Sequence, residues 1–451
     1  MDEQLPIEIF ESIMFELEDF ELAILLHVNH RWREIILKSF SGRIVKKKKF
    51  TNRVARFSYL NLLEWGYANG CLLRKKMCAN AALNGHLDIL IWAQLNQCDF
   101  DEQICSFAAW SGHLDILKWA RKNNYPWNSS TCSNAAYRGH LDILKWAREN
   151  NCPWDVSTCS NAAAGGHLNI IDWVINNGAP WDYSTLANAA KRGHLDILIW
   201  MDNKVQYLRR HTLICAYAAL GGHFNILQWL RSNNYLWDAA TCWNAAKGGH
   251  LNILIWARQN GCQWDDRTCT EAALGGYLEV LKWAREHGCE WNNTVCSNAA
   301  LNGHLEVLKW ARQNGCEWNE LVCSNAASTG HLEVLKWARQ NGCRWNESAC
   351  SNAASNGHFN VLRWLRENQC PWNKLTCSYA AFNGHLDILQ WARSNGCDWD
   401  EDICVWATFK NRLNIIDWLG ENQCPYREDE FVEEIPKLER SDGFPKGTEF
   451  I

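Results

Sequence analysis

Apolar residues recur along most of the chain at helical spacing, in two short segments separated by Gly-His. Residues 127–153 show the pattern clearly (WNSSTCSNAAYRGHLDILKWARENNCP). In the first segment the small residues Cys132, Ala135 and Ala136 follow the i, i+3, i+4 spacing of one helix face, which lets a neighbouring helix approach closely. The pattern predicts a first helix that Gly139 ends and a second helix that begins directly after it.

The second predicted helix is apolar over more than half of its circumference. Asn128 stands where the first helix needs an N-cap, and Asp142 lies in the first turn of the second helix, where the helix dipole favours an acid. A solitary amphipathic helix has a narrower apolar stripe, so the second helix must be covered on several sides. One pair of helices cannot bury this surface, whereas a stack of pairs can. The apolar residues of the second helix are Leu141, Ile143, Leu144, Trp146 and Ala147.

The pattern repeats with a period of 27 residues. Its histidine stands at positions 86, 113, 140, 167, 194, 223, 250, 304, 331, 358 and 385, with Tyr277 and Arg412 in the two remaining places. Together with a degenerate first copy around Tyr59, this makes fourteen copies between residues 50 and 426. We therefore expect an all-α solenoid of about fourteen two-helix repeats. The step from His194 to His223 is 29 residues, which predicts interrupted packing around residues 205–212.

The composition is unusual in its 28 Trp and 22 Cys, and the repeat accounts for both. Fourteen Trp share one position of the second helix and ten more stand directly before the first helix, which leaves Trp32, Trp110, Trp243 and Trp406. Twelve Cys lie in the first helix and ten in the turn after the second. Because buried Cys acts as a small hydrophobe, we expect all 22 to be thiols with a packing role. Stacked helices lie ~8–10 Å apart, too far for neighbouring copies to share a metal ion, so no metal or cofactor is expected.

Other functional classes find little support in the sequence. The net charge of −5 gives no basic field for nucleic acid. The N-terminus lacks the pattern of a secretory signal, and no stretch approaches the ~18 apolar residues of a membrane span. These two absences favour an intracellular protein. No nucleophile–base arrangement or phosphate-binding loop stands out, so the pattern favours binding over catalysis.

The unit ending at Asn319, CSNAALNGHLEVLKWARQNGCEWN, resembles an ankyrin repeat. The Ala-Ala pair, the Gly-His, the Leu-Glu-Val-Leu-Lys run and the closing Asn-Gly follow in the family's order. Ankyrin units have 33 residues, and the six missing here come from the segment that carries the projecting β-turn finger, so a reduced finger is expected. The TPLH tetrapeptide of the family is replaced by Cys-Ser-Asn. Short units of this kind are common in large DNA viruses of protists and in some protists.

The pair of residues before each Gly-His varies most from copy to copy. The resemblance places these positions at the end of the first helix on the concave face, where ankyrin repeats bind protein partners. Alternatively, they are solvent positions that tolerate any residue. The candidates for target binding are Trp110, Tyr137, Arg138, Lys191, Arg192, Lys247 and Phe382.

Residues 5–36 resemble an F-box, the module that docks on the Skp-family adaptor of cullin–RING ubiquitin ligases. The resemblance rests on an opening Leu-Pro and on a run from Val28 to Arg33 that matches the closing Val-Cys-x-x-Trp-Arg signature, with Asn29 in place of Cys. It implies an adaptor-binding role for Leu5, Pro6, Ile9, Phe10, Val28 and Trp32. The alternative is an N-terminal cap that only covers the end of the solenoid.

The sequence thus divides into an F-box-like module (1–42), a basic linker (43–50), the solenoid (51–426) and a charged C-terminal tail (427–451). The basic run 43–56 is either a solvated linker or a nuclear import signal. The resemblances together imply a substrate receptor that joins a Skp-family adaptor to a target protein. The alternative is a scaffold or decoy that binds a host protein without a ubiquitin ligase.

Overall fold

The computed structural model describes residues 47–68, 71–204, 209–422 and 424. The F-box-like module and the C-terminal tail lie outside these residues. So do all six predicted adaptor-binding residues: Leu5, Pro6, Ile9, Phe10, Val28 and Trp32.

The described residues form α-helices joined by turns, without a β-strand among them. Twenty-eight helices, α4 to α31, form fourteen consecutive pairs, which confirms the predicted all-α solenoid. The chain divides into two compact units, residues 1–236 and 237–451.

Within the first unit the pairs are α4 (Lys47–Arg56) with α5 (Leu60–Ala68), α6 (Lys75–Leu83) with α7 (Leu87–Leu95), α8 (Gln103–Ser111) with α9 (Leu114–Lys122), α10 (Ser129–Arg138) with α11 (Leu141–Glu149), α12 (Val156–Gly165) with α13 (Leu168–Asn176), α14 (Tyr183–Arg192) with α15 (Leu195–Lys204), and α16 (Leu213–Leu220) with α17 (Phe224–Ser232).

Within the second unit they are α18 (Ala239–Lys247) with α19 (Leu251–Gln259), α20 (Arg267–Gly275) with α21 (Leu278–Glu286), α22 (Thr294–Leu301) with α23 (Leu305–Gln313), α24 (Leu321–Ser328) with α25 (Leu332–Gln340), α26 (Glu347–Ser355) with α27 (Phe359–Glu367), α28 (Lys374–Asn383) with α29 (Leu386–Ser394), and α30 (Asp402–Phe409) with α31 (Leu413–Glu421).

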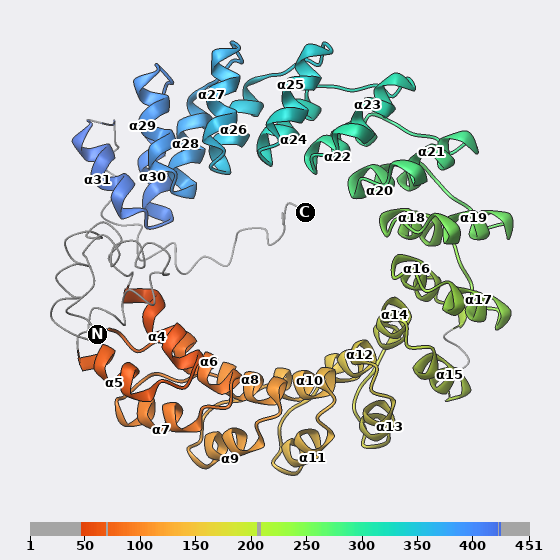
Figure 1. Cartoon of the computed structure of the whole chain (residues 1–451), viewed down its shortest axis with the longest axis vertical. Coiled ribbons are helices and arrows are strands. Elements are labelled where there is room, and N and C mark those ends of the chain that lie inside the picture. Colours follow the sequence, from red (N-terminus) through yellow and green to blue (C-terminus); the bar gives the residue numbers. More distant parts are fainter. Residues whose placement is uncertain (1–46, 69–70, 205–208, 423, 425–451) are drawn as a thin grey trace, which may run out of the picture. The chain divides into compact units, whose positions relative to one another are not determined.

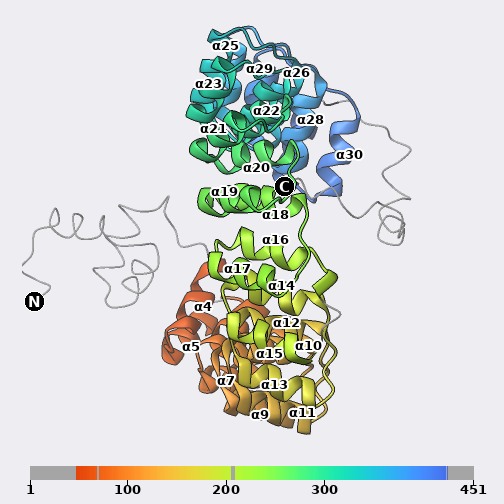
Figure 2. The ribbon, with the colours of Figure 1, turned by 90° about the vertical axis from the view of Figure 1, so that its right-hand side faces the viewer.

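Each unit contains two parallel rows of helices (Figures 1 and 2). The even-numbered helices form an inner row, in which each helix packs directly against the next, and each odd-numbered helix lies outside its even-numbered partner. The inner helices can approach closely because they meet through small side chains, such as the fully buried Cys132, Ala135 and Ala136 of α10. The predicted packing role of these residues is confirmed.

The helix ends follow the sequence signals. The Asn128 side chain accepts a hydrogen bond from the backbone N–H of Ser130 and so caps α10. Gly139 ends the same helix with φ +87°, a left-handed conformation that suits glycine because it has no Cβ. Asp155 and Asp182 cap α12 and α14 as Asn128 caps α10.

The Gly-His pair joins each repeat to the one before it. Nε2 of His167 lies 3.1 Å from the backbone oxygen of Tyr137, at the end of the preceding inner helix. Since a carbonyl can only accept, His167 donates this hydrogen bond. Its ring also fills the space beside Gly139, where an added Cβ would lie 2.8 Å from the ring. The same arrangement recurs along both units, so the repeated histidine is a connector between repeats.

The two repeated Trp positions meet in a second connection, on the outer side of the repeats. Trp154, which precedes α12, packs edge-on against Trp173 of α13, with ring centres 6.1 Å apart. Arg148 at the end of α11 lies over Trp154, 4.0 Å from the ring centre. Arg148 also donates a hydrogen bond to the backbone oxygen of Cys152, which orients the guanidinium. This Arg–Trp–Trp stack explains why most repeats carry two Trp.

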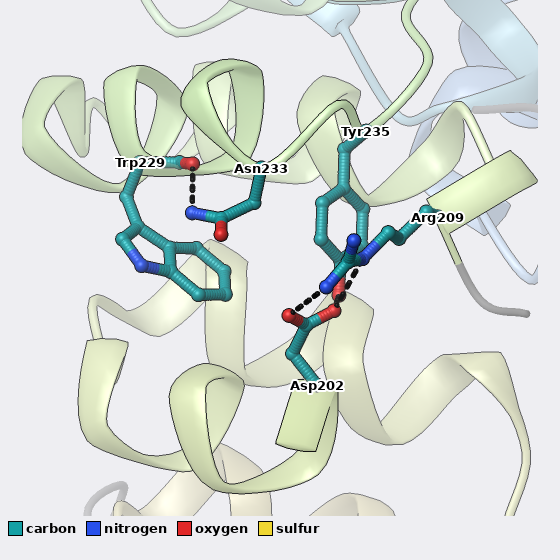
Figure 3. A network of polar contacts seen from close by, with 5 residues as sticks. All are labelled: Asp202, Arg209, Trp229, Asn233 and Tyr235. Carbon is teal, nitrogen blue, oxygen red and sulfur yellow. Dashed lines mark hydrogen bonds and ion pairs between the residues drawn. The ribbon is translucent and has the colours of Figure 1, made fainter. Parts of the chain in front are cut away.

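The irregular step between His194 and His223 does not interrupt the inner row, because α14 and α16 pack against each other. Our expectation of interrupted packing is therefore wrong for the inner helices. The buried Asp202 accepts two hydrogen bonds from Arg209, at 2.9 and 2.6 Å, and one from the Tyr235 hydroxyl at 2.9 Å (Figure 3). This network links Asp202 of α15 to Arg209, which precedes α16, and to Tyr235, which follows α17.

Candidate protein-binding surface

The variable residues before each Gly-His occupy the last turn of the inner helices. We call the residues three positions before each repeated histidine, or its substitute, the helix-end row. Their backbone oxygens are acceptors for the connecting side chains, as at Lys191 with His223 and at Phe382 with Arg412. The backbone of the row is thus fixed by stacking, while its side chains are free to differ. The row comprises Arg56, Leu83, Trp110, Tyr137, Ala164, Lys191 and Leu220 in the first unit, and Lys247, Leu274, Leu301, Ser328, Ser355, Phe382 and Phe409 in the second.

Three of the predicted binding residues come together in the first unit. The rings of Trp110 and Tyr137 stack with centres 5.1 Å apart and planes 12° apart. The guanidinium of Arg138 lies 5.3 Å from the centre of the Trp110 ring. The two rings are half-buried and Arg138 is exposed. This cluster offers a flat aromatic surface beside a cation, a combination that is enriched where proteins bind proteins.

Two further predicted residues form a separate site at the end of α14. The ammonium of Lys191 lies 6.0 Å from the centre of the Tyr217 ring on α16. Lys191 and its neighbour Arg192 are both exposed. The inner helix α12 separates this site from the Trp110–Tyr137 pair, so the structure does not join the two groups into one cluster.

In the second unit, Lys247 is partly engaged by the stack itself. Its ammonium lies 3.4 Å from a carboxylate oxygen of Glu271 on the next inner helix. Lys247 is exposed and Glu271 is half-buried, and an ion pair near the surface contributes little to stability, about 0–1 kcal/mol.

Phe382 is the centre of a larger cluster at the end of the second unit. Its ring packs edge-on against Trp406, with centres 5.5 Å apart, and parallel to Phe409 at 6.4 Å. The ammonium of Lys410 lies 4.7 Å from the centre of the Phe382 ring. Trp406 and Phe409 are large apolar residues yet remain 46% and 56% exposed. Exposed apolar groups that lie together on a surface are typical of interaction sites.

Sequence reasoning missed Trp406, Phe409 and Lys410 as site residues. One signal was present, because Trp406 is outside both repeated Trp positions. Phe409 belongs to the helix-end row of the last copy, where Asn411-Arg412 replaces Gly-His, and it was not among the predicted binding residues.

The two repeated cysteine positions meet within each repeat that carries a cysteine at both, a contact that the sequence pattern did not predict. The thiol in the inner helix contacts the thiol in the turn after the outer helix, 20 residues later, as in Cys78 with Cys98, whose sulfurs are 3.1 Å apart. Nine such pairs exist, and their other members are Cys132–Cys152, Cys242–Cys262, Cys269–Cys289, Cys296–Cys316, Cys323–Cys343, Cys350–Cys370, Cys377–Cys397 and Cys404–Cys424.

Where the turn position carries a residue other than cysteine, burial is the main influence on the pKa of the thiol in the inner helix. It raises the pKa of the Cys105 and Cys159 thiols to about 12 in each case. Twenty of the 22 cysteines are buried, which confirms their packing role, and Cys98 and Cys404 are the two half-buried ones. Within the described ranges, no group of three or more His, Cys, Asp or Glu side chains is placed to hold a metal ion. In the same ranges, no helix is both long enough and apolar enough to cross a membrane.

Comparison with known proteins agrees with the repeat pattern. Residues 294–339 and 323–366 match the family model of ankyrin repeats in many copies. Among solved structures, the ankyrin repeat domain of human ASB11 is similar at 17% sequence identity and a TM-score of 0.30, over 35% of this chain and 84% of that domain. No curated protein matches the chain. Residues 294–366 are therefore similar to ankyrin repeats, which are modules for protein–protein interaction.

Proposed function

We propose that this protein is the substrate receptor of a cullin–RING ubiquitin ligase, with the helix-end row binding a target protein and residues 1–42 binding a Skp-family adaptor. The observation that carries the target-binding half is the exposed aromatic and cationic cluster around Phe382. Stacking of the repeats does not need it, since six other copies stack with serine or leucine at the same position. The adaptor-binding half rests on the F-box-like sequence pattern. Ubiquitination by such a ligase would take place in the cytoplasm or nucleus.

The cluster around Phe382 suits a partner with an apolar anchor and a nearby acidic group. Trp406 and Phe409 are both about half exposed, and the Lys410 ammonium places a positive charge 5.6 Å from the centre of the Phe409 ring. The Trp110–Tyr137–Arg138 cluster in the first unit has the same chemistry. Aromatic residues and arginine contribute most of the binding energy at many protein interfaces.

Affinity purification of the full-length protein from its native cells tests target binding. We expect that the double variant Trp406→Ala, Phe409→Ala loses a captured target, because ~2 kcal/mol or more per hot-spot residue corresponds to at least about 30-fold weaker binding. Leu321→Ala is the matched control, because Leu321 is equally exposed (51%) but lies at the opposite end of an inner helix, away from the row. Capture that is unchanged in the double variant and lost in Leu321→Ala would place the binding surface elsewhere.

Adaptor binding is tested with a purified Skp-family adaptor. The full-length protein should bind it, and replacement of Leu5 and Pro6 by alanine should abolish binding without changing the thermal unfolding of the repeats. If the wild-type protein binds no such adaptor, or if the double replacement unfolds the first repeats, residues 1–42 are a cap. The protein is then a scaffold or decoy for the same target, and the ligase proposal is withdrawn.

A further inference from the structure

The dithiol Cys78–Cys98 differs from the other eight pairs in its surroundings. In those pairs the turn thiol is buried and donates a hydrogen bond to a backbone oxygen in the segment that leads into the inner helix. The acceptor lies 24 residues earlier in the chain, as in the hydrogen bond from Cys316 to Asn292 at 3.4 Å. Cys98 is half-buried, and its sulfur lies 3.1 Å from the Cys78 sulfur and 3.8 Å from the backbone oxygen of Asp99. It is thus the one half-buried turn thiol of a pair, because the other half-buried cysteine, Cys404, lies in the inner helix α30.

The two sulfurs are already in van der Waals contact. A disulfide bond of ~2.05 Å requires them to approach by about 1 Å more. Cys78 is fully buried in α6 and cannot meet a large reagent, whereas Cys98 can. The pair therefore has an accessible thiol that reacts first and a protected thiol that resolves the product.

The charges around the pair favour the same order of events. The hydrogen bond from Cys78 lowers the pKa of the Cys98 thiol, and the nearby Lys75 ammonium lowers it further, against burial and Asp99, which raise it. Lys75 is held in place by an ion pair with Asp99 at 2.8 Å. The hydrogen bond to Cys98 and burial raise the pKa of Cys78, which keeps that thiol protonated while Cys98 ionises.

We propose that Cys78–Cys98 is a site of reversible oxidation, at which a peroxide converts the two thiols into a disulfide within one repeat. The Cys98 thiolate attacks one peroxide oxygen, the O–O bond breaks, and Cys98 becomes a sulfenic acid as the first water leaves. The Cys78 sulfur then attacks the Cys98 sulfur, the S–O bond breaks, and the second water leaves with the Cys78 proton. Two thiols lose two electrons and two protons, and one peroxide becomes two waters.

The product ties the inner helix α6 to the turn after α7, and so clamps one repeat near the start of the solenoid. A disulfide that closes a loop of this length restricts the unfolded chain and stabilises the folded one. Oxidation is therefore expected to slow hydrogen exchange in α6 and α7, with no such effect on α22 and α23, where the pair Cys296–Cys316 stays reduced.

The test uses the reduced full-length protein and hydrogen peroxide. After timed exposure the remaining thiols are blocked, the protein is digested, and disulfide-linked peptides are quantified by mass spectrometry. We expect the Cys78–Cys98 link to form at least ~10-fold faster than the links of the buried pairs Cys296–Cys316 and Cys323–Cys343, because oxidation follows exposure and Cys98 is half-buried whereas the turn thiols of the other two pairs are buried. Dithiothreitol should restore both thiols.

The variant Cys98→Ser should lose the link and leave Cys78 reduced, while the matched variant Cys316→Ser should keep the Cys78–Cys98 link. The wild-type time course decides the question even if a variant fails to fold. The proposal is overturned if Cys98 accumulates as sulfinic acid beside a reduced Cys78, if the buried pairs oxidise at the same rate, or if Cys98 links to a second copy of the chain.

Discussion

The glycine and histidine of each repeat act as a pair, but across the boundary between two repeats. Gly303 ends α22 with φ +76°, and the ring of His331 from the following repeat covers it so closely that an added Cβ would lie 2.6 Å from Nδ1. Glycine is thus needed for two reasons at once, its backbone conformation and the space that it leaves. Gly315 ends the outer helix α23 with φ +83° and has open space around its Cα.

These two glycines separate conformational strain from steric clash. Gly315→Ala should lower the free energy of unfolding by about 1–2 kcal/mol, because a residue with a Cβ is strained in the left-handed conformation. Gly303→Ala should cost that amount plus about 1–3 kcal/mol, because the His331 ring must move and its connection to the preceding repeat weakens. Urea unfolding of both variants, followed by circular dichroism, measures the difference. Equal losses of stability in the two variants would show that the ring yields without cost.

For single residues, the sequence predicted helix ends and burial better than it predicted which side chains contact one another. The N-cap of Asn128, the end at Gly139 and the burial of Cys132 could all be read from helical spacing. The contact between Cys132 and Cys152 could not, because it depends on the path of the turn after the outer helix and not on any period. The stack of Trp110 on Tyr137 was likewise hidden, since residues 27 apart become neighbours only when the repeats are stacked in register.

Between elements, the irregular step after α15 shows how a stack tolerates an insertion. Asp202 has a side chain only 7% exposed, and its charge is balanced by Arg209 and by the Tyr235 hydroxyl. Tyr235 stands at the turn position that cysteine occupies in most repeats and is itself fully buried. The tyrosine side chain is larger than cysteine and reaches the Asp202 carboxylate of the preceding repeat. A polar network therefore fills the space at this turn that a pair of thiols fills in other repeats.

Asp202→Ala should destabilise the first unit by about 2–3 kcal/mol, because the variant leaves the Tyr235 hydroxyl buried without its acceptor and Arg209 without its counter-ion. Lys204→Ala is the control from the same segment. Its ammonium pairs with Asp172 at 3.8 Å between exposed side chains, so its loss should change stability by less than about 0.5 kcal/mol. Thermal unfolding and hydrogen exchange of α15 and α17 measure both effects, and similar losses in the two variants would contradict a structural role for the network.

The network also sets the direction of a pH effect. The hydrogen bonds from Arg209, and next that from Tyr235, lower the pKa of Asp202 from its ordinary 3.8, against burial. The folded state therefore binds this proton less readily than the unfolded state. The contribution to stability is complete above pH 3.8 and is lost as the pH falls below that value toward the lowered pKa. The acid unfolding of Asp202→Ala should accordingly be less steep in this range than that of the wild type.

At the scale of the molecule, stability is distributed over repeats that contact only their neighbours. The surface that one repeat offers to the next is almost the same in the copies around residues 278–286, 305–313 and 332–340, where the outer helices share the run Leu-Glu-Val-Leu-Lys-Trp-Ala-Arg. In such an array the total stability is close to a sum of repeat and interface contributions, so a missing repeat removes one contribution of each kind.

Deletion of residues 304–330 tests this additivity. The 27-residue cut joins Gly303 to His331, restores Gly-His, and places α26 against α22. We expect a folded protein whose melting temperature is within about 5 °C of the wild type. Deletion of residues 304–317 is the control, because it removes the outer helix α23 alone and leaves two inner helices in succession. This shorter deletion should broaden the melting transition, and an equally sharp transition in both would contradict the repeat as the unit of stability.

The near-identity of these neighbouring copies has a consequence for inheritance. Stretches of the gene that encode the same eight residues at each copy are natural partners for unequal recombination, which adds or removes one whole copy at a time. In these copies the histidine of each repeat packs against the glycine of the repeat before it. Each such event therefore yields a chain in which the Gly-His contacts between repeats are kept. Within the second unit, the number of repeats between Lys247 and the cluster around Phe382 can therefore rise or fall between generations in steps of one repeat, while both ends are transmitted unchanged. A lineage can in this way test new spacings between two binding residues of one unit without first having to rebuild the protein that carries them.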